Sequence, residues 1–322
     1  MTAARLAAAC ALAAAVLVAW SAAAAQNGAR VVEGRVIRPG AAGPAPVAGA
    51  WVVLHRVGPD TAGPLDSVRS RADGSYTIHY RAFGSAQAVY FVATKYDGIA
   101  YLSSALSGPR VAGADGDLTV FDTTSSGVTV HERGRHVIVF APEADGGRNV
   151  MEVYELANDA DRTLVPGGAG RPAWSAPLAP GAADFRAEQG DVSTGGMSAG
   201  QGRVEVYAPF APGLKQLSFS YRLPKNAWPL TLPAARDTLV LEVLLEETSG
   251  SATGGGLRAQ GPQLVQGRTF LRFLAPNAPP QSAVVIAPGA APHSRMTYAV
   301  LALVLAIAGA MLIALFAALR RS

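Results

Sequence analysis

The sequence predicts an all-β protein with two tandem β-sandwich domains and a C-terminal transmembrane helix. Three observations lead to this fold class. Short runs of β-branched and aromatic residues recur between Gly, Pro and Asp turn signals, no amphipathic helical pattern of useful length interrupts them, and residues 297–319 contain no charged side chain. With 322 residues, the chain has room for two domains of ordinary size before that helix.

Residues 1–25 have the pattern of a secretory signal peptide. Arg5 is followed by an apolar run from Leu6 to Trp20, and alanines at positions 23–25 form an A-x-A cleavage site. The run is shorter than the ~20 residues that a spanning helix needs, which argues against an uncleaved first membrane helix. We therefore expect cleavage after Ala25 and export of the chain that follows.

The cysteine content limits the chemistry of the exported part. Cys10 is the only cysteine, and it lies inside the signal. Its spacing from Leu6 does not fit a lipoprotein signal, so we expect no lipid on the mature chain. Without Cys10, the exported domains have no disulfide and no thiolate metal ligand.

The charge of the exported part is nearly balanced. Removing Arg5, Arg320 and Arg321 from the 27 basic residues leaves 24, against 23 acidic residues. This balance provides no basic field for nucleic acid. Arginine greatly outnumbers lysine, and Ala, Gly and Pro are abundant, which is typical of proteins from GC-rich bacterial genomes.

Residues 297–319 predict the transmembrane helix. At ~1.5 Å per residue this segment reaches about 34 Å, enough to cross a hydrocarbon core. Arg320 and Arg321 follow it, and paired arginines favour a cytoplasmic C-terminus. We therefore expect a single-pass protein of a bacterial cell membrane. Its N-terminal domains would lie outside, periplasmic or extracellular, with residues 320–322 as a cytoplasmic tail.

Small residues recur every four positions along this helix. Such spacing forms a shallow ridge on which a second helix can pack closely. The alternative is chance, because the segment is rich in alanine. The helix-packing candidates are Ala302, Ala306, Gly309, Ala310, Ala314 and Ala318.

Residues 26–125 predict the first sandwich. Asp73-Gly74 and Asp97-Gly98 are strong hairpin signals, because Asp and Gly both tolerate positive φ. Each signal lies between two runs that favour strands. The expected strands are Val31–Ile37, Trp51–Arg56, Ser67–Arg71, Ser75–Arg81, Ala88–Lys95 and Ile99–Ser103.

Three motifs in this domain follow the order of a known family. They are Val32-Glu33-Gly34-Arg35-Val36, then Pro46-Val47-Ala48-Gly49-Ala50-Trp51-Val52-Val53-Leu54, then Arg71-Ala72-Asp73-Gly74-Ser75-Tyr76. In this order they resemble the carboxypeptidase regulatory-like domain, and the similarity covers residues 31–104. The resemblance implies a transthyretin-like seven-stranded sandwich. It also implies a rigid spacer or binding platform beside other domains, without the peptidase itself.

Residues 126–275 predict a second sandwich, immunoglobulin-like in the loose sense. Strand-like runs recur with the spacing of such a fold. The segments 190–202 and 249–256 are rich in Gly and Ser and are expected to be mobile loops. The expected strands are Val128–Glu132, His136–Phe140, Val150–Ala157, Arg203–Ala208, Gln216–Leu223, Thr238–Glu246 and Thr269–Leu274.

Residues 276–296 are predicted to form a Pro/Ala-rich stalk. Five prolines lie between positions 275 and 292. Such a density of proline disfavours a helix and a central strand, so we expect a semi-extended segment that lifts the sandwiches off the membrane.

No catalytic, cofactor-binding or metal-binding constellation is predicted. His131 and His136 are five positions apart in a strand context, whereas a zinc peptidase needs HExxH spacing on a helix. No G-x-S-x-G nucleophile motif occurs. The segments 115–117 and 158–161 contain oxygen ligands that Ca²⁺ could use, but turn formation explains the same residues.

Aromatic side chains concentrate in the first domain. They allow a stacking platform for carbohydrate, although core packing is favoured because they fall on the alternating faces of expected strands. These residues are Trp51, Tyr76, Tyr80, Tyr90, Tyr96 and Tyr101.

Together these observations predict a non-enzymatic, membrane-anchored envelope protein. Its exported sandwiches would act as a binding or scaffolding module for a protein partner in the envelope. The alternative is an accessory subunit of a membrane complex, recruited through its transmembrane helix. A large apolar patch on a sandwich face would favour the first function.

Overall fold

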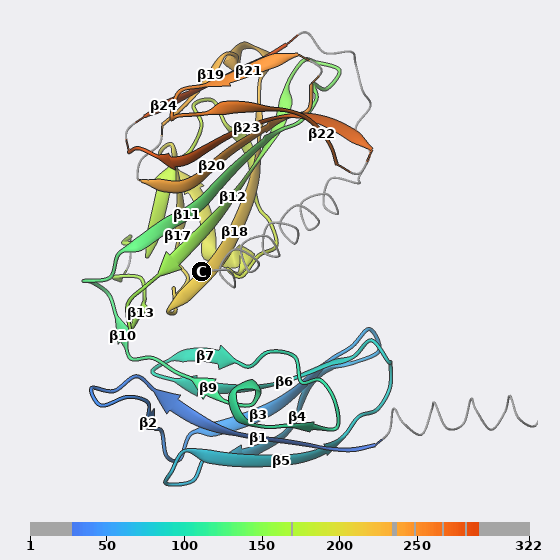
Figure 1. Cartoon of the computed structure of the whole chain (residues 1–322), viewed down its shortest axis with the longest axis vertical. Coiled ribbons are helices and arrows are strands. Elements are labelled where there is room, and N and C mark those ends of the chain that lie inside the picture. The colour runs from blue at the N-terminus through green and yellow to red at the C-terminus, as the bar shows by residue number, and fades with distance from the viewer. Residues whose placement is uncertain are drawn as a thin grey trace, which may run out of the picture. The chain divides into compact units, whose positions relative to one another are not determined.

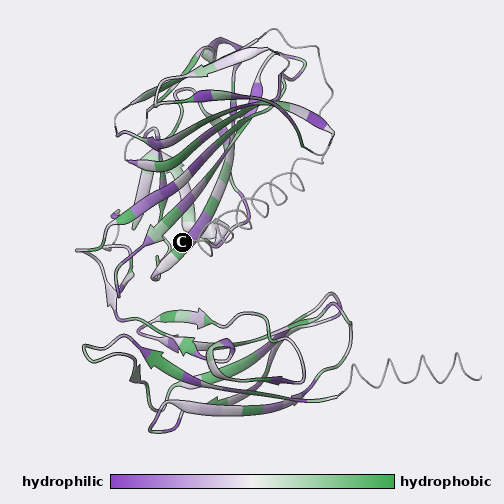
Figure 2. Ribbon diagram, viewed as in Figure 1, coloured by the Kyte–Doolittle hydropathy of each residue, from purple (hydrophilic) through white to green (hydrophobic). Residues whose placement is uncertain are grey.

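The structure is a computed structural model that describes residues 28–168, 170–233, 237–247, 249–265, 267–280 and 282–289. It is all-β, and its strands form several sheets (Figure 1). The chain divides into two compact units, with the boundary between Thr123 and Thr124. Figure 2 shows that apolar residues are distributed along the strands of both units.

Several predicted features lie outside the described residues. They are the signal peptide at 1–25, the helix at 297–319 with the tail that follows it, and the helix-packing candidates from Ala302 to Ala318. Within the described ranges, no helix has the length and apolar character that a membrane crossing requires.

The first unit is a sandwich of two sheets. In one sheet β1 pairs antiparallel with β2 and β5 and parallel with β8 and β9. The other sheet has the order β4-β3-β6-β7 and is antiparallel throughout. The strands are β1 (Ala29–Arg38), β2 (Ala45–Pro46), β3 (Trp51–Val57), β4 (Ala62–Arg69), β5 (Ser75–Arg81), β6 (Val89–Tyr96), β7 (Ile99–Leu102), β8 (Arg110–Val111) and β9 (Leu118–Thr119), with a single 3-10 turn at Gly113–Asp115.

The core of the first unit lies between these sheets. Alternate residues of β3, β5 and β6 are buried, as the period-two geometry of a strand requires; examples are Leu54, Ile78 and Val92. Tyr80 and Tyr90 meet across the core with ring centroids 5.3 Å apart.

The two hairpin signals in this unit have different outcomes. Asp97 and Gly98 have φ of 46° and 83°, and they join β6 to β7 as predicted. Gly74 also lies in a turn, but β4 pairs with β3 and β5 pairs with β1, so the predicted hairpin across Asp73-Gly74 is wrong. Turn chemistry sets only the local reversal. The choice of strand partner depends on which faces become buried.

The second unit has one large sheet and two small ones. The large sheet has the order β15-β18-β12-β11-β20-β23-β22, and the small sheets have the orders β14-β17-β16 and β19-β24-β21, beside a short β10-β13 pair. The strands of the large sheet are β11 (Val130–Val139), β12 (Arg148–Asn158), β15 (Ala183–Ala187), β18 (Gly213–Leu223), β20 (Thr238–Leu245), β22 (Arg258–Val265) and β23 (Arg268–Ala278). The others are β10 (Thr123–Thr124), β13 (Thr163–Leu164), β14 (Trp174–Pro177), β16 (Met197–Gly200), β17 (Arg203–Val206), β19 (Leu230–Pro233), β21 (Gly250–Thr253) and β24 (Ala283–Pro288), with 3-10 turns at Thr194–Gly196 and Lys225–Ala227.

One hydrophobic core joins the inner face of the large sheet to both small sheets. Phe219 and Tyr154 from the large sheet belong to the same buried cluster as Val206 of β17 and Ile286 of β24. A smaller cluster lies on the opposite, outward face of the large sheet. It contains Ile138, Phe140, Met151, Val153, Leu244 and Phe270, all buried.

Two details of the large sheet differ from the prediction. The strands expected at 128–132 and 136–140 form the single strand β11, with a bulge between Glu132 and Gly134. In addition, β11 pairs parallel with β20. This parallel pair at the centre of a seven-stranded sheet departs from the antiparallel sheets expected of an immunoglobulin-like domain.

The predicted stalk is wrong in its described part. β23 continues to Ala278, and β24 is a central strand between β19 and β21 with Val284 and Ile286 buried. Proline is tolerated because β22 pairs with β23 only as far as Leu274, so Pro276 needs no N–H toward a second neighbour. The predicted loop at 249–256 likewise contains β21, which pairs with β24.

Candidate binding surface

The two central strands of the β4-β3-β6-β7 sheet are apolar on both faces. In β3, Val52 and Leu54 are buried in the core, yet the residues that point outward include Trp51, Val53 and Val57. A half-buried antiparallel strand normally alternates apolar residues with polar ones. The absence of alternation places an apolar surface on the outside of this sheet.

We call this surface the apolar sheet face, and the strand registers define its members. Residues directly opposite one another on neighbouring strands point to the same side of a sheet. The face consists of Ala62, Pro64, Ser67 and Arg69 of β4, Trp51, Val53, His55 and Val57 of β3, Val89, Phe91, Ala93 and Lys95 of β6, and Ala100 and Leu102 of β7.

The large side chains of the apolar sheet face remain accessible. Trp51 is 51% exposed and Leu102 is 59% exposed, and Val57 and Val89 are exposed by nearly half. Contiguous exposed apolar residues on a soluble domain mark sites of interaction. The face carries no carboxylate, and its permanent charges are the cations of Arg69 and Lys95.

Two ring contacts order the side chains on this face. The guanidinium of Arg69 lies over the ring of Trp51, 4.6 Å from its centroid. The rings of His55 and Phe91 stack at 5.2 Å with an interplanar angle of 7°. An exposed cation–π contact contributes about 0.5–1 kcal/mol, enough to bias the rotamers of Trp51 before any partner binds.

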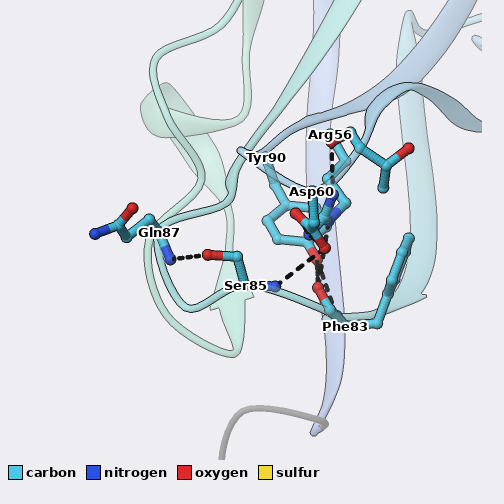
Figure 3. A network of polar contacts seen from close by, with 7 residues as sticks. Arg56, Asp60, Phe83, Ser85, Gln87 and Tyr90 are labelled. Carbon is cyan, nitrogen blue, oxygen red and sulfur yellow. Dashed lines mark hydrogen bonds and ion pairs between the residues drawn. The ribbon is translucent and has the colours of Figure 1, made fainter.

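A polar network holds the end of the sandwich beside this face (Figure 3). The guanidinium of Arg56, 1% exposed, donates from Nη2 to both oxygens of Asp60 at 2.7 and 2.8 Å, from Nη1 to the Thr61 carbonyl and from Nε to the Phe83 carbonyl. Arg56 also lies 4.6 Å over the Phe83 ring, and the Ser85 amide donates to Asp60. The β3–β4 turn is thereby fixed to the loop that leads into β6.

This network also explains one glycine and one pKa shift. Gly84 has φ of 71°, and a Cβ there would lie 2.2 Å from Oδ2 of Asp60 and 2.5 Å from Nη2 of Arg56. The hydrogen bond from Arg56 lowers the pKa of the Asp60 carboxyl below its usual range. The network therefore keeps its ion pair in the charged form.

The main core of the second unit contains a buried network of charged and hydroxyl groups. Arg135 donates from Nε to Glu152 at 2.9 Å, and the hydroxyls of Tyr154 and Tyr221 donate to the two oxygens of the same carboxylate at 3.0 and 2.8 Å. Burial raises the pKa of both tyrosines well above the usual value. Arg135 and Glu152 are both buried and form an ion pair, so this group is a structural network and not an open site.

A polar row crosses the outward face of the seven-stranded sheet. Nδ1 of His136 lies 2.8 Å from Glu242, its Nε2 lies 3.9 Å from Glu155, and Arg272 donates to Glu242 at 2.5 Å. Burial would raise the pKa of Glu242, but hydrogen bonds from His136 and Arg272 lower it below the usual value. The charges on this face are thus compensated across neighbouring strands.

The residues considered for metal binding serve other contacts. His131 faces Asp159 at 3.9 Å while His136 contacts Glu242, so the two imidazoles do not converge. Asp117 accepts the backbone N–H of Arg35. In the part of the chain that the structure describes, no three His, Cys, Asp or Glu residues are placed to hold a metal ion.

The oxygens of the second candidate calcium segment are also engaged. Asn158 accepts the Ala160 amide and donates to the carbonyls of Arg162 and Phe210, and Asp159 pairs with Arg133 at 2.6 Å. The bonds from Asn158 to Ala160 and Arg162 are those of a tight turn, as the alternative interpretation of this segment expected.

The aromatic residues of the first domain divide between core and surface. Tyr76, Tyr80, Tyr90 and Tyr101 are buried, which confirms core packing for them. Tyr96 is half-buried, and its hydroxyl donates to Asp122 at 2.8 Å. Trp51 points outward and is exposed, and it lies on the apolar sheet face.

Sequence reasoning missed most of this face. It did not identify His55, Phe91, Val57, Leu102 or the two cations as members of one surface. A signal was present: the runs 51–54 and 89–93 are apolar at odd and even positions alike, whereas 75–81 alternates cleanly. Continuous apolar runs in an antiparallel sheet predict that both faces of a strand are apolar.

Comparison with known proteins adds little to this geometry. No family model and no curated protein matches the chain. A solved structure of a proposed protease from Parabacteroides distasonis is 12% identical, over 49% of this chain and 40% of that one, with a TM-score of 0.28. A mutant of a two-domain M1 zinc metallopeptidase, bound to L-arginine, is 13% identical over 49% and 42%, with a TM-score of 0.30. The similarity thus spans less than half of either protein and carries no argument about function.

Proposed function

We propose that this chain is a non-enzymatic, membrane-anchored envelope protein whose exported β-sandwich units form a binding module. The apolar sheet face of the first unit is the binding surface. One observation carries this proposal: the outward face of β4-β3-β6-β7 is apolar and exposed, and it has no carboxylate. Burial of such a face against a partner removes apolar surface from water and so lowers the free energy of the complex.

The first unit belongs, in this proposal, to the carboxypeptidase regulatory-like domains. The support is the motif order in residues 31–104 and the two-sheet sandwich that those residues form. The anchor is the helix at 297–319, preceded by export through the signal at 1–25. Only the seven residues 290–296 separate the described chain from that anchor, so they span at most about 25 Å.

An accessory-subunit function through the helix remains the second candidate. The small-residue ridge from Ala302 to Ala318 favours it, because such ridges pack against other helices. The two functions place the partner contact in different segments of the chain, which makes them separable by position-specific crosslinking.

The experiment is photo-crosslinking in native membranes with benzoylphenylalanine introduced at Val53, at the centre of the apolar sheet face. The matched control is His79, which points outward from the other sheet of the same sandwich. A third probe at Ala310 reports on the helix. The proposal expects a discrete adduct from Val53 and none from His79. Adducts from Ala310 alone would favour the accessory-subunit function and overturn the proposal.

A further inference from the structure

We infer that the partner of the apolar sheet face is a different protein, apolar where it meets the centre of the face and carrying a carboxylate where it meets Trp51. This inference rests on the proposed function and specifies the chemistry of the partner. It follows from the positions of the two cations, from the lack of a carboxylate partner for either of them in the described chain, and from the apolar composition of the rest of the face.

The two cations of the face lie at one end, on either side of Trp51. Arg69 of β4 is directly opposite Trp51. On the other side, β3 and β6 pair as far as Val52 and Thr94, and Trp51 and Lys95 are the next residues of the two strands beyond that pair. The exposed indole and both positive charges thus lie at the same end of three adjacent strands.

Neither cation has a carboxylate partner in the described part of the chain. Arg69 stacks on Trp51 and makes one long hydrogen bond, 3.4 Å, to the Gly49 carbonyl. On the opposite sheet of the same sandwich, Arg110 binds Glu33 at 2.7 Å. Arg69 and Lys95 therefore remain available for an anion supplied from outside.

A purely apolar partner would not suit this end of the face. Covering Arg69 and Lys95 would remove them from water, and a desolvated charge without a partner is costly. A carboxylate on the partner would offset that cost and would make hydrogen bonds to the Arg69 guanidinium. The centre, with Val53, Phe91 and Ala93, requires only complementary apolar groups.

The same charges argue against a second copy of this chain. Two such faces packed together would bring cations from both copies and no carboxylate from either. Like charges juxtaposed at an interface oppose association. The composition also differs from that of a lipid-binding surface, for which clusters of about four to eight basic residues are typical. Trp, Phe and Arg on a flat apolar surface are instead typical of the centre of protein interfaces.

The test uses the full chain in native membranes, with benzoylphenylalanine at Val53 and mass spectrometry of the adduct. The inference expects a peptide of another protein with Asp or Glu near the crosslinked position. Arg69→Glu combined with Lys95→Glu should reduce the adduct at least tenfold, and changing the partner carboxylate to Lys should restore it. Arg81→Glu, a charge reversal on the opposite sheet, is the matched control and should leave the adduct unchanged.

Folding and function are separable in this test. Arg69 and Lys95 are exposed, so the double variant should still fold cooperatively, and its unfolding temperature should fall only by the small amount that loss of the Arg69–Trp51 contact explains. An adduct with a second copy, with lipid, or with a peptide lacking carboxylates would overturn the inference and leave the binding function standing. An adduct that persists in the double variant would also overturn it. The absence of any adduct at Val53 would instead overturn the proposed function.

Discussion

The outward faces of two sheets, one in each unit, differ in how far their side chains are buried and in whether their charges are paired. On the seven-stranded sheet of the second unit, Ile138 and Met151 are buried, and Glu242 is compensated by His136 and Arg272. On the four-stranded sheet of the first unit, large apolar residues are half exposed, and Arg69 and Lys95 have no carboxylate partner among the described residues. On the first of these faces, the carboxylate of Glu242 already has partners on the neighbouring strands. The second face leaves apolar side chains in water and cations without a carboxylate partner among the described residues, and we therefore assign binding to it.

The same contrast holds for the buried arginines. Arg135 and its partner Glu152 both lie inside the core of the second unit, whereas Arg56 in the first unit pairs with Asp60, whose side chain is 41% exposed. If one partner of an ion pair deep in a core is removed, water cannot hydrate the charge that remains. The second unit should therefore respond far more strongly than the first to the loss of one charge.

Glu152→Gln should cause the largest loss of stability. It leaves the Arg135 guanidinium buried without a counter-charge, and breaking a buried pair in this way costs about 3–5 kcal/mol. Urea unfolding of a chain ending at Gly289 measures the change. Arg135→Met combined with Glu152→Leu should recover much of the loss, because no unpaired charge remains. A loss below about 1 kcal/mol for Glu152→Gln would show that the pair is not desolvated.

Met151→Ala should come next, and it compares the two outward faces directly. Met151 is 1% exposed in the second unit, so the truncation should cost about 2–4 kcal/mol in transfer and cavity terms. The matched change Leu102→Ala, at an exposed position of the apolar sheet face, should cost less than about 0.5 kcal/mol. Equal losses in urea unfolding would mean that the two faces do not differ as described.

Gly84→Ala tests how rigidly the Arg56–Asp60 network holds the end of the first sandwich. Any residue other than glycine is strained at positive φ, by about 1–2 kcal/mol. Gly108→Ala is the control, since Gly108 has φ of 88° but open space around its Cβ position. Gly84→Ala should lower the thermal midpoint more, because its Cβ displaces Asp60 or Arg56. Identical thermal midpoints for the two variants would show that Asp60 and Arg56 can move aside without loss of stability.

The pH dependence of the second unit should carry a contribution from Glu242. Its pKa is lowered in the folded state, so its stabilising contribution is complete above the ordinary value of about 4.5 and is lost as pH falls through the lower folded pKa. Glu242→Gln should therefore flatten the stability profile below about pH 5. An unchanged acid limb in the variant would contradict the ionised, hydrogen-bonded state described for this group.

The sequence predicted the strands of the first unit better than their partners. Ser75–Arg81 is observed as predicted because its alternation reports one buried face. The partner of that strand depends on contacts distant in sequence, so the hairpin at Asp73-Gly74 could not be judged from the turn alone. Proline density misled the prediction for 276–296, because proline disrupts a strand only where its missing N–H is needed.

The candidate surface was only partly predictable. Trp51 was identified as an aromatic of interest, and the apolar runs of β3 and β6 contained the remaining signal. The position of Lys95 beside Trp51 depends on the register between β3 and β6, which a single sequence does not determine. The buried charges of the second unit are harder still, because Arg135 and Glu152 become neighbours only through strand pairing.

Labelling of introduced cysteines tests the central claim most directly, because Cys10 is the only natural cysteine. In a Cys10→Ala background, Leu102→Cys on the apolar sheet face is compared with Leu264→Cys, 71% exposed in the second unit. Both should react rapidly with a polar maleimide in the isolated chain. In native membranes Leu102→Cys should be protected at least tenfold while Leu264→Cys stays reactive. Equal labelling of Leu102→Cys in both preparations would contradict the claim that this face binds a partner.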